Sequence, residues 1–321
     1  MIGTIFRIDN IIESDLNDIS IIRLSLCNEN EHGLEKLASY IRMEMSKNNA
    51  DADLFFLGNI LREMCEYETA TICFDQHLNM LENKFTFEAA YCYTGLGDIA
   101  RAKGDYDLSI IHHRNAIEIY SNNESNNEQI LSIAYNKLGA AFRQKKQYDQ
   151  ALVVYQKALK IQEKYPESEE VATTYYNMGI LCEEQDIFYE ALKYYKQSLT
   201  IRKQYLPSDH YKIARLYRGM GETYYYHGDY ALALEHLEKS LDITVKSRTE
   251  NHYDLGLLYH HIGRVYEDTG KIELALKNYI EADKIYRHAL PSNHEWVLEN
   301  QQHIDNMTKK RTIIDFSDKI F

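Results

Sequence analysis

Hydrophobic residues recur at three- and four-residue intervals over most of the chain, and the stretch from Leu206 to Ile243 shows this pattern clearly. Gly228 and Asp229 divide the stretch with a residue that tolerates a left-handed backbone and a polar side chain able to cap a helix. Large apolar residues fall on one helical face of each half: Ile213, Leu216, Tyr217, Met220 and Tyr224 in the first, and Leu234, Leu237 and Leu241 in the second. The pattern predicts an antiparallel helical hairpin.

The same pattern recurs along the chain at intervals of 39 to 42 residues. Nine residues after a phasing glycine stands a large apolar residue, twelve after it a small one, and sixteen after it an aromatic residue, histidine or leucine. A glycine lets two helix axes approach while bulky side chains fill the space on either side. The phasing glycines of the six predicted hairpins are Gly58, Gly97, Gly139, Gly179, Gly221 and Gly263.

This pattern resembles the tetratricopeptide repeat family over residues 50–309. The period is longer than the 34 residues usual for that family, and it is similar to the variant found in kinesin light chains. The closer resemblance is carried by Leu206–His210 (LPSDH) and Leu290–His294 (LPSNH), each leading into a first helix, whereas Pro166 has no histidine after it. The resemblance implies an all-α, right-handed superhelical solenoid of six helix-turn-helix hairpins, whose first helices line an inner groove.

The two ends of the chain depart from the repeat. Thr4–Ile12 and Ser20–Leu26 are rich in isoleucine and predict two short strands, and Glu31–Lys47 predicts a helix. A lone two-stranded hairpin is marginal in water, so residues 1–50 are either a cap on the first repeat or the remnant of a larger domain. Residues 51–309 form the predicted solenoid, ending in a capping helix at Trp296–Met307, and residues 310–321 form a tail.

A second resemblance concerns the two predicted strands. Residues 2–8 and 21–26 resemble the last strands of arginine ADP-ribosyltransferase domains that precede such repeats in some multidomain proteins. In that family the catalytic arginine, serine and glutamates lie upstream of these strands, and no Glu-x-Glu precedes Phe6 here. The resemblance implies that the chain is the repeat portion of such an enzyme, without its catalytic half.

Charge and cysteine content narrow the function classes. The formal net charge of −13 disfavours nucleic acid and anionic membranes as partners, because phosphate contacts demand a basic surface. The N-terminus has no basic flank followed by an apolar core, and no stretch approaches eighteen uninterrupted apolar residues, which predicts a soluble cytoplasmic protein. An odd number of scattered cysteines predicts buried free thiols rather than disulfides or metal ligands: Cys27, Cys65, Cys73, Cys92 and Cys182.

The sequence predicts neither catalysis nor a cofactor or metal. Gly95–Gly97 and Gly219–Gly221 do not follow strands and contain phasing glycines, which argues against a dinucleotide loop. The pairs His112-His113 and His260-His261 point about 100° apart on a helix and cannot chelate as an i, i+4 pair would. Glu183–Asp186 is typical of a solvated helix end.

The predicted groove offers the remaining candidate site. Four residues after the glycine, the first three repeats carry arginine, and arginine forks can hold carboxylates bidentately. The predicted groove residues are Arg62, Arg101, Asn136, Arg143, Tyr176, Arg215, Arg218 and Tyr225. An acidic segment or a C-terminal carboxylate is the expected ligand. Alternatively, these arginines pair with neighbours such as Glu63 or Asp98 and form only a salt-bridged, solvated face.

Three functions follow from this interpretation. The first is a non-catalytic scaffold that binds an extended, acidic protein or peptide segment in its groove. The second is the repeat portion of an ADP-ribosyltransferase. The third is a regulatory repeat protein whose superhelix tightens on binding a peptide. The sequence does not identify the partner or the oligomeric state.

Overall fold

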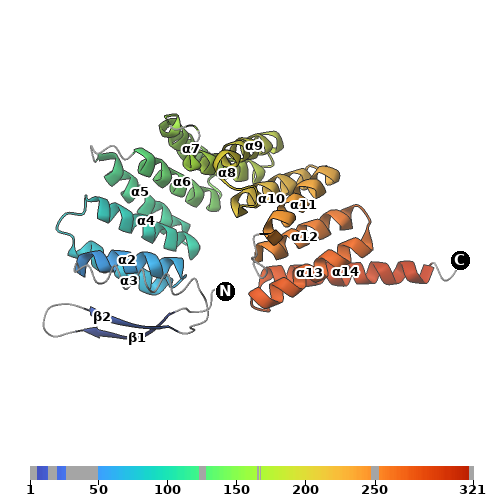
Figure 1. The fold of residues 1–321 in the computed structure, drawn as a ribbon, viewed down its shortest axis with the longest axis horizontal. Helices are drawn as coiled ribbons and strands as arrows, with labels where there is room; N and C mark the ends of the chain where they lie inside the picture. The colour runs from blue at the N-terminus through green and yellow to red at the C-terminus, as the bar shows by residue number, and fades with distance from the viewer. Residues whose placement is uncertain are drawn as a thin grey trace. The chain divides into compact units, whose positions relative to one another are not determined.

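The fold is taken from a computed structural model (Figure 1). The residues it describes are 6–13, 20–26, 50–122, 128–164, 166, 168–246 and 253–317. The chain divides into two compact units, residues 1–158 and 159–321, and each is described by itself. Within the described residues there are two strands and thirteen helices. The helical repeats predicted from the glycine phase are confirmed in both units.

The N-terminal segment of the first unit contains two strands. Strand β1 (Phe6–Glu13) pairs antiparallel with β2 (Ser20–Leu26), with Phe6 opposite Leu26 and a register shift between Ile8 and Asn10. The predicted strands were Thr4–Ile12 and Ser20–Leu26, and the predicted helix Glu31–Lys47 lies outside the described residues. Whether this segment caps the first repeat or belongs to a larger domain stays a prediction.

Helical hairpins make up the rest of the first unit. Neighbouring helices pack side by side in sequence order (Figure 1). Thr86 caps the N-terminus of helix α4, where its hydroxyl accepts a hydrogen bond from the Ala89 amide at 3.3 Å. The helices are α2 (Ala50–Glu63), α3 (Tyr67–Met80), α4 (Phe87–Ala102), α5 (Tyr106–Asn122), α6 (Glu128–Gln144) and α7 (Tyr148–Gln162), the last of which continues into the second unit.

The second unit contains seven further helices. They are α8 (Glu169–Glu183), α9 (Phe188–Tyr205), α10 (Tyr211–Tyr226), α11 (Tyr230–Lys246), α12 (Tyr253–Asp268), α13 (Ile272–Ala289) and α14 (Glu295–Ser317). Helix α14 is the expected helix after the last repeat, but it is longer than the predicted Trp296–Met307. It extends through Ser317 and therefore includes much of the predicted tail.

The two histidines of the LPSDH and LPSNH segments begin helices. Nδ1 of His210 accepts a hydrogen bond from the Lys212 amide at 3.1 Å, and Nδ1 of His294 accepts one from the Trp296 amide at 3.3 Å. Each ring satisfies an amide that has no partner within its helix. The histidines that carry the closer family resemblance therefore have a structural role as helix caps.

The phasing glycines are covered by the residue sixteen positions later. A Cβ added at Gly139 would lie 2.4 Å from the Tyr155 ring, and one at Gly179 would lie 2.5 Å from the Tyr195 ring. Tyr155 and Tyr195 are themselves fully buried. The glycines thus give an aromatic ring direct access to the helix backbone, which explains the spacing of sixteen residues.

Some of these rings also contact the next repeat. Phe74 lies against its own Gly58 and against Gly95 of the following hairpin, where an added Cβ would approach the ring to 2.7 Å. Tyr195 in the second unit likewise lies against Gly179 and Gly219. These contacts account for Gly95 and Gly219, which made two short segments look like fragments of a nucleotide loop.

A left-handed residue ends the first helix of every hairpin. It stands seven positions after the phasing glycine in all six repeats, with φ between 57° and 86°. The six residues are Cys65, Gly104, Lys146, Asp186, Gly228 and Gly270. The turn predicted at Gly228 is therefore a feature of the whole array, and three repeats place a non-glycine residue in a conformation that favours glycine.

The cysteines divide into two groups. Cys73, Cys92 and Cys182 are buried, as predicted, and burial raises the pKa of Cys73 and Cys182 to about 11. The prediction was wrong for Cys65, which is exposed because it occupies the left-handed turn after α2. Cys27 lies outside the described residues.

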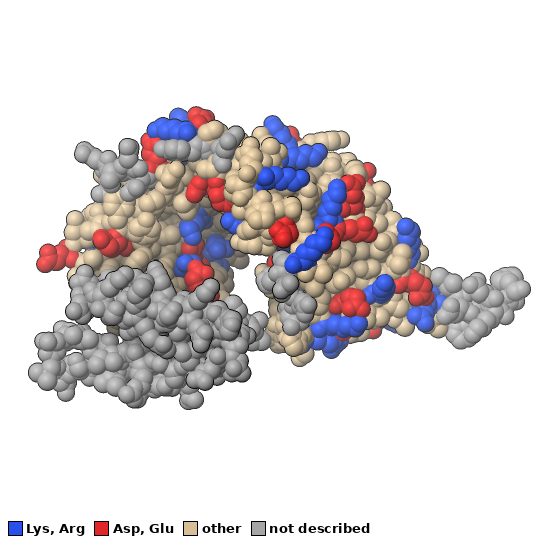
Figure 2. Space-filling model, viewed as in Figure 1, with Lys and Arg blue, Asp and Glu red and all other residues tan. Residues whose placement is uncertain are grey.

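None of the described helices combines the length and the apolar character that crossing a membrane would require. On the face shown in Figure 2, Lys and Arg side chains lie close to Asp and Glu side chains at several places on the described surface.

Candidate functional site

The first helices of three successive hairpins in the first unit meet at a buried carboxylate. Asp98, one residue after a phasing glycine, is 8% exposed and forms ion pairs with Lys137 of the next repeat and with Arg62 of the previous one, the latter at 3.5 Å. Burial raises the pKa of Asp98, but these two cations outweigh burial and lower it overall. Asp98 is therefore ionised and connects three successive repeats.

His113 lies beside this carboxylate and covers Gly97. Its Nε2 is 3.9 Å from Asp98, yet burial lowers the pKa of His113 to about 3. The ring is therefore neutral near pH 7 and acts as packing against the glycine. Asp98 is therefore paired with the two cations Lys137 and Arg62 and not with a charged His113.

The structure places the predicted arginines of the first unit in different surroundings. Arg62 is engaged with Glu63 at 2.7 Å and with Asp98. Arg101 is half-buried and forms no ion pair within the described part of the chain. Arg143 is also half-buried, whereas Asn136 is only 6% exposed. Arg101 is thus the least committed member of the predicted column.

The same column in the second unit is occupied by Glu183, Tyr225 and Glu267. Tyr195 donates its hydroxyl hydrogen bond to Glu183, and Tyr279 donates one to Glu267 at 2.7 Å. Burial, together with the nearby carboxylate of Glu222, raises the pKa of Glu183 to about 8. Glu183 is therefore protonated at neutral pH and packed against Tyr195, which differs from the predicted solvated helix end.

Glu222 carries the negative charge of this cluster. One of its carboxylate oxygens lies 3.0 Å from Nε2 of His261 and 3.7 Å from Nη1 of Arg218. Burial raises the pKa of Glu222, but His261 and Arg218 outweigh it and lower the pKa to about 2. Arg218, one of the predicted groove residues, is consequently committed to an internal ion pair.

The two predicted tyrosines of the second unit carry guanidinium groups on their rings. Tyr176 is only 9% exposed, with Arg215 5.2 Å and Arg202 5.5 Å from the ring centroid. Arg264 lies 4.7 Å from the centroid of Tyr225. These cation–π contacts cover ring faces that the sequence analysis expected to be open to a ligand.

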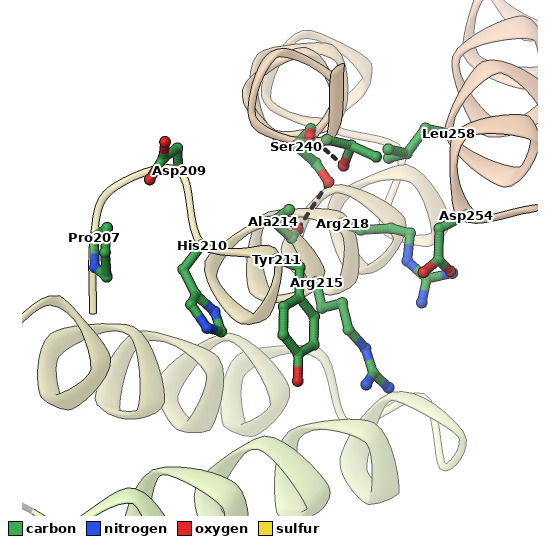
Figure 3. A pocket seen from close by; sticks show the side chains of 11 residues that line it. Pro207, Asp209, His210, Tyr211, Ala214, Arg215, Arg218, Ser240, Asp254 and Leu258 are labelled. Carbon is green, nitrogen blue, oxygen red and sulfur yellow. Dashed lines mark hydrogen bonds between the residues drawn. The ribbon is translucent and has the colours of Figure 1, made fainter. Parts of the chain in front are cut away.

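A pocket of about 560 Å³ lies at the beginning of α10 (Figure 3). Its walls come from the LPSDH turn and from α10, α11 and α12. Figure 3 shows Arg215 extending away from α10, while Arg218 and Asp254 point toward one another. The lining residues are Pro207, Asp209, His210, Tyr211, Ala214, Arg215, Arg218, Ser240, Thr244, Asp254 and Leu258.

Hydrogen bonds hold one wall of this pocket. The Ser240 hydroxyl donates to the Ala214 carbonyl at 2.8 Å, and the Thr244 hydroxyl donates to the Ser240 carbonyl at 2.8 Å. Arg215 is exposed at the pocket and forms no ion pair among the described residues. The site therefore offers a shaped cavity next to a cation that contacts the Tyr176 ring but has no carboxylate partner among the described residues.

The sequence analysis found Arg215 and Arg218 but missed the rest of this pocket. Asp254 and Leu258 belong to the following repeat, and Ser240 belongs to a second helix, so no spacing within one helix joins them to Arg215. The available signal was the LPSDH segment, which precedes α10 and supplies Pro207 and His210.

The sequence profile of the tetratricopeptide repeat matches residues 86–164, 129–204, 170–246 and 212–288, which together cover more than half of the chain. This protein belongs to the tetratricopeptide repeat family. The matched segments overlap by one hairpin each, in agreement with the phased glycines. A comparison with curated protein sequences finds no match.

Solved structures with the same fold are distant in sequence. BtubC (BKLC) from P. vanneervenii is 20% identical with a TM-score of 0.58, covering 75% of this chain and 93% of that one. TPR-like repeats assigned to a kinesin light chain from Podosopora anserina are 16% identical with a TM-score of 0.52, covering 61% and 94%. A Rap protein complexed with competence and sporulation factor is 13% identical with a TM-score of 0.61, covering 86% and 80%.

Proposed function

We propose that this protein is a non-catalytic scaffold that binds an extended acidic peptide segment, with a carboxylate held by Arg215 at the pocket beside α10. The observation that carries the proposal is the exposed guanidinium of Arg215 next to a cavity of about 560 Å³. This guanidinium contacts the Tyr176 ring but has no carboxylate partner among the described residues. Arginine binds carboxylates in a two-pronged geometry, and shaped cavities next to such a cation select for the adjoining side chain.

The electrostatics of the pocket favour a carboxylate at one position only. Arg218 is occupied by Glu222, and Asp254 contributes a negative charge beside it. A ligand carboxylate near Arg215 would be attracted, whereas one near Asp254 would be repelled. We therefore expect a single acidic group, such as a C-terminal carboxylate, followed by apolar contacts with Ala214 and Leu258.

Arg101 offers a separate contact in the first unit. It is half-buried and unpaired within the described residues, in a column whose other arginines are engaged or enclosed. We infer that acidic segments also bind weakly at this position. The solved Rap complex with competence and sporulation factor supports a binding role for repeats of this fold, since that relative holds a partner.

The test uses fluorescence anisotropy with three labelled pools of random nonapeptides: acidic with a free C-terminal carboxylate, acidic with a C-terminal amide, and lysine-rich. The full chain should bind the first pool most tightly and the third least. Raising the salt concentration should weaken binding, because exposed charges are screened over about 8 to 10 Å at physiological ionic strength. Equal binding of the acidic and lysine-rich pools would overturn the proposal.

A matched pair of variants locates the site. Arg215→Glu should abolish binding of the free-carboxylate pool, whereas Lys239→Glu should leave that binding unchanged. Lys239 lies on α11, the second helix of its hairpin, where it pairs with Glu235 and does not line the pocket. Both substitutions change the net charge equally. Equal loss in the two variants would show that binding depends on total charge and not on the pocket.

The resemblance of the N-terminal strands to ADP-ribosyltransferase domains supports a second candidate function. In this alternative the repeats recruit a substrate to a catalytic domain, and the purified chain itself turns over no NAD. An assay of NAD consumption by the full chain tests this, and turnover would contradict both the scaffold and the recruiting role.

A third candidate is a regulatory repeat protein that changes shape on binding. Rings that contact two repeats, such as Tyr195, support it because they would pass a change in one hairpin to the next. Small-angle scattering with and without the acidic pool should then show compaction at saturation. Unchanged scattering at full occupancy would contradict this candidate and leave the scaffold proposal in place.

A further inference from the structure

Three possible metal ligands meet between the last repeat and the final helix. His260 comes from α12, and Glu299 and His303 come from α14, where their spacing of four residues places them on one helical face. One ligand atom from each side chain lies within 4.8 Å of the other two. The sequence analysis dismissed His260 because it considered only its neighbour His261.

The hydrogen bonds of His260 determine which of its nitrogens is free. The Asn300 side-chain NH₂ donates to the Tyr279 carbonyl at 2.8 Å, so the amide oxygen of Asn300 faces His260 as an acceptor. Nδ1 of His260, 3.0 Å away, must therefore be the donor. The Nε2 lone pair is left facing Glu299, whose carboxylate oxygen is 4.0 Å away.

His303 is oriented in the same manner. Its Nδ1 lies 2.8 Å from a Glu267 carboxylate oxygen that also accepts the Tyr279 hydroxyl at 2.7 Å. The ring stacks on Tyr279, with 4.9 Å between the centroids. With Nδ1 donating to Glu267, the Nε2 lone pair remains for a ligand. A histidine that donates its second nitrogen to a carboxylate is the usual arrangement around bound zinc.

We propose that His260, Glu299 and His303 bind one Zn²⁺ ion between α12 and α14. Two imidazole nitrogens and one carboxylate, with water in the fourth position, form a donor set that suits zinc. Ca²⁺ and Mg²⁺ prefer sites built from oxygen ligands.

Only a small adjustment is required to close the site. Zinc bonds to nitrogen and oxygen measure about 2.0 to 2.2 Å, which brings tetrahedral ligand atoms to roughly 3.4 Å from one another. Glu299 is 55% exposed and can change its side-chain torsions to approach His260. His260 is 6% exposed and His303 is stacked on Tyr279, so the two histidines supply the rigid part of the site.

The test is titration of the metal-free full chain with ZnCl₂, followed by calorimetry and by thermal unfolding. We expect one ion per chain and a rise in Tm that MgCl₂ and CaCl₂ do not produce. CoCl₂ provides a second readout, because a tetrahedral site gives intense visible absorption bands. Absence of stoichiometric zinc binding would overturn the proposal.

Four variants locate the ion. Glu299→Gln changes an exposed side chain, should not disturb folding, and should weaken zinc binding at least about tenfold, as should His303→Gln. Glu267→Gln removes the negative charge of the carboxylate that contacts both His303 and Tyr279, and it should weaken zinc binding by about 10- to 100-fold. His261→Gln is the matched control, because it changes the adjacent histidine, which contacts Glu222 instead. Equal zinc affinity in the wild type and Glu299→Gln would place the ion elsewhere and refute the site.

Discussion

The two units use the same repeat geometry but place different kinds of side chain at the same structural position. Four residues after the phasing glycine the first unit has Arg62, Arg101 and Arg143, whereas the second has Glu183, Tyr225 and Glu267. In the first unit a buried carboxylate, Asp98, lies among cations, and in the second Tyr195 and Tyr279 donate hydroxyl hydrogen bonds to glutamates. The difference shows that backbone phase determines where this column lies, while its chemistry is set by neighbouring repeats.

The largest expected effect is on stability and comes from removing Asp98, the buried carboxylate of the first unit. Asp98→Ala should destabilise the protein by about 3 kcal/mol, because Lys137 and Arg62 lose the anion that compensates their partial burial. Denaturant unfolding measures this. Asp107→Ala, which removes an exposed partner of Lys145, is the control and should change stability by less than about 1 kcal/mol. Similar effects of the two substitutions would show that Asp98 does not organise the unit.

The next prediction concerns the contact that both units share. Gly139→Leu and Gly179→Leu should each cost about 1 to 3 kcal/mol, because the new side chain would overlap the rings of Tyr155 and Tyr195. Thermal unfolding of the two variants is the measurement. An unchanged midpoint in either variant would mean that the ring does not cover the glycine in that unit.

Glu183 in the second unit should make stability depend on pH between about 4.5 and 8. The unfolded Glu183 carboxyl titrates near pH 4.5 and the folded one near pH 8, so the unfolded chain releases its proton first. The contribution of Glu183 to stability is therefore complete below about pH 4.5 and is lost as the pH rises toward 8. Since each pKa unit of difference corresponds to about 1.4 kcal/mol, Glu183→Gln should stabilise the protein by about 1 kcal/mol or more at pH 8.

Unfolding of the wild type and Glu183→Gln at a series of pH values checks this prediction. The stability difference should shrink toward zero as the pH falls to 4.5, because wild-type Glu183 is then protonated in both states. Arg101→Gln in the first unit should show no such trend. A difference that is independent of pH would indicate a packing effect of the substitution and not the protonation of Glu183.

The smallest expected effect concerns the left-handed turns. Lys146→Gly should stabilise the first unit by about 0.5 kcal/mol, since glycine removes the strain of a positive φ but also gives the unfolded chain more freedom. Asp186→Gly should stabilise the protein by less than Lys146→Gly does, because aspartate tolerates this conformation better than lysine. Gly104→Ala should instead destabilise the protein, because alanine is strained at the positive φ of this turn. Stabilisation by Gly104→Ala would refute the assignment of strain to this turn.

The sequence predicted the hairpins because their packing depends on residues in fixed phase, such as Gly179 and Tyr195. It also named Glu63 and Asp98 as alternative partners of the arginines, and Arg62 pairs with both. It did not predict the other partners, because they lie in successive repeats: Lys137 is 39 positions from Asp98, and His303 is 36 positions from Glu267. Which positions meet across a repeat interface depends on the rotation between hairpins. That rotation leaves no periodic signal in a single sequence.

For the same reason the sequence could not rank the predicted groove residues, whose binding role stays a prediction. It could not distinguish Arg62 and Arg218, which form ion pairs, from Arg101 and Arg215, which form none within the described residues. Likewise, the ring of Tyr176 carries two guanidinium groups contributed by α9 and α10. Pairing within the folded chain determines which of several similar side chains remains available to a ligand.

The rings of Phe74 and Tyr195 have a consequence for how the array opens. Each ring fills a glycine gap in its own hairpin and a second gap in the next one, so neither hairpin can separate without exposing it to water. Opening one interior repeat should therefore release its neighbour as well, and local fluctuations should begin at the free ends of the array, where a repeat has one neighbour. Amide hydrogen exchange in α8 and α10 should accordingly proceed as one event.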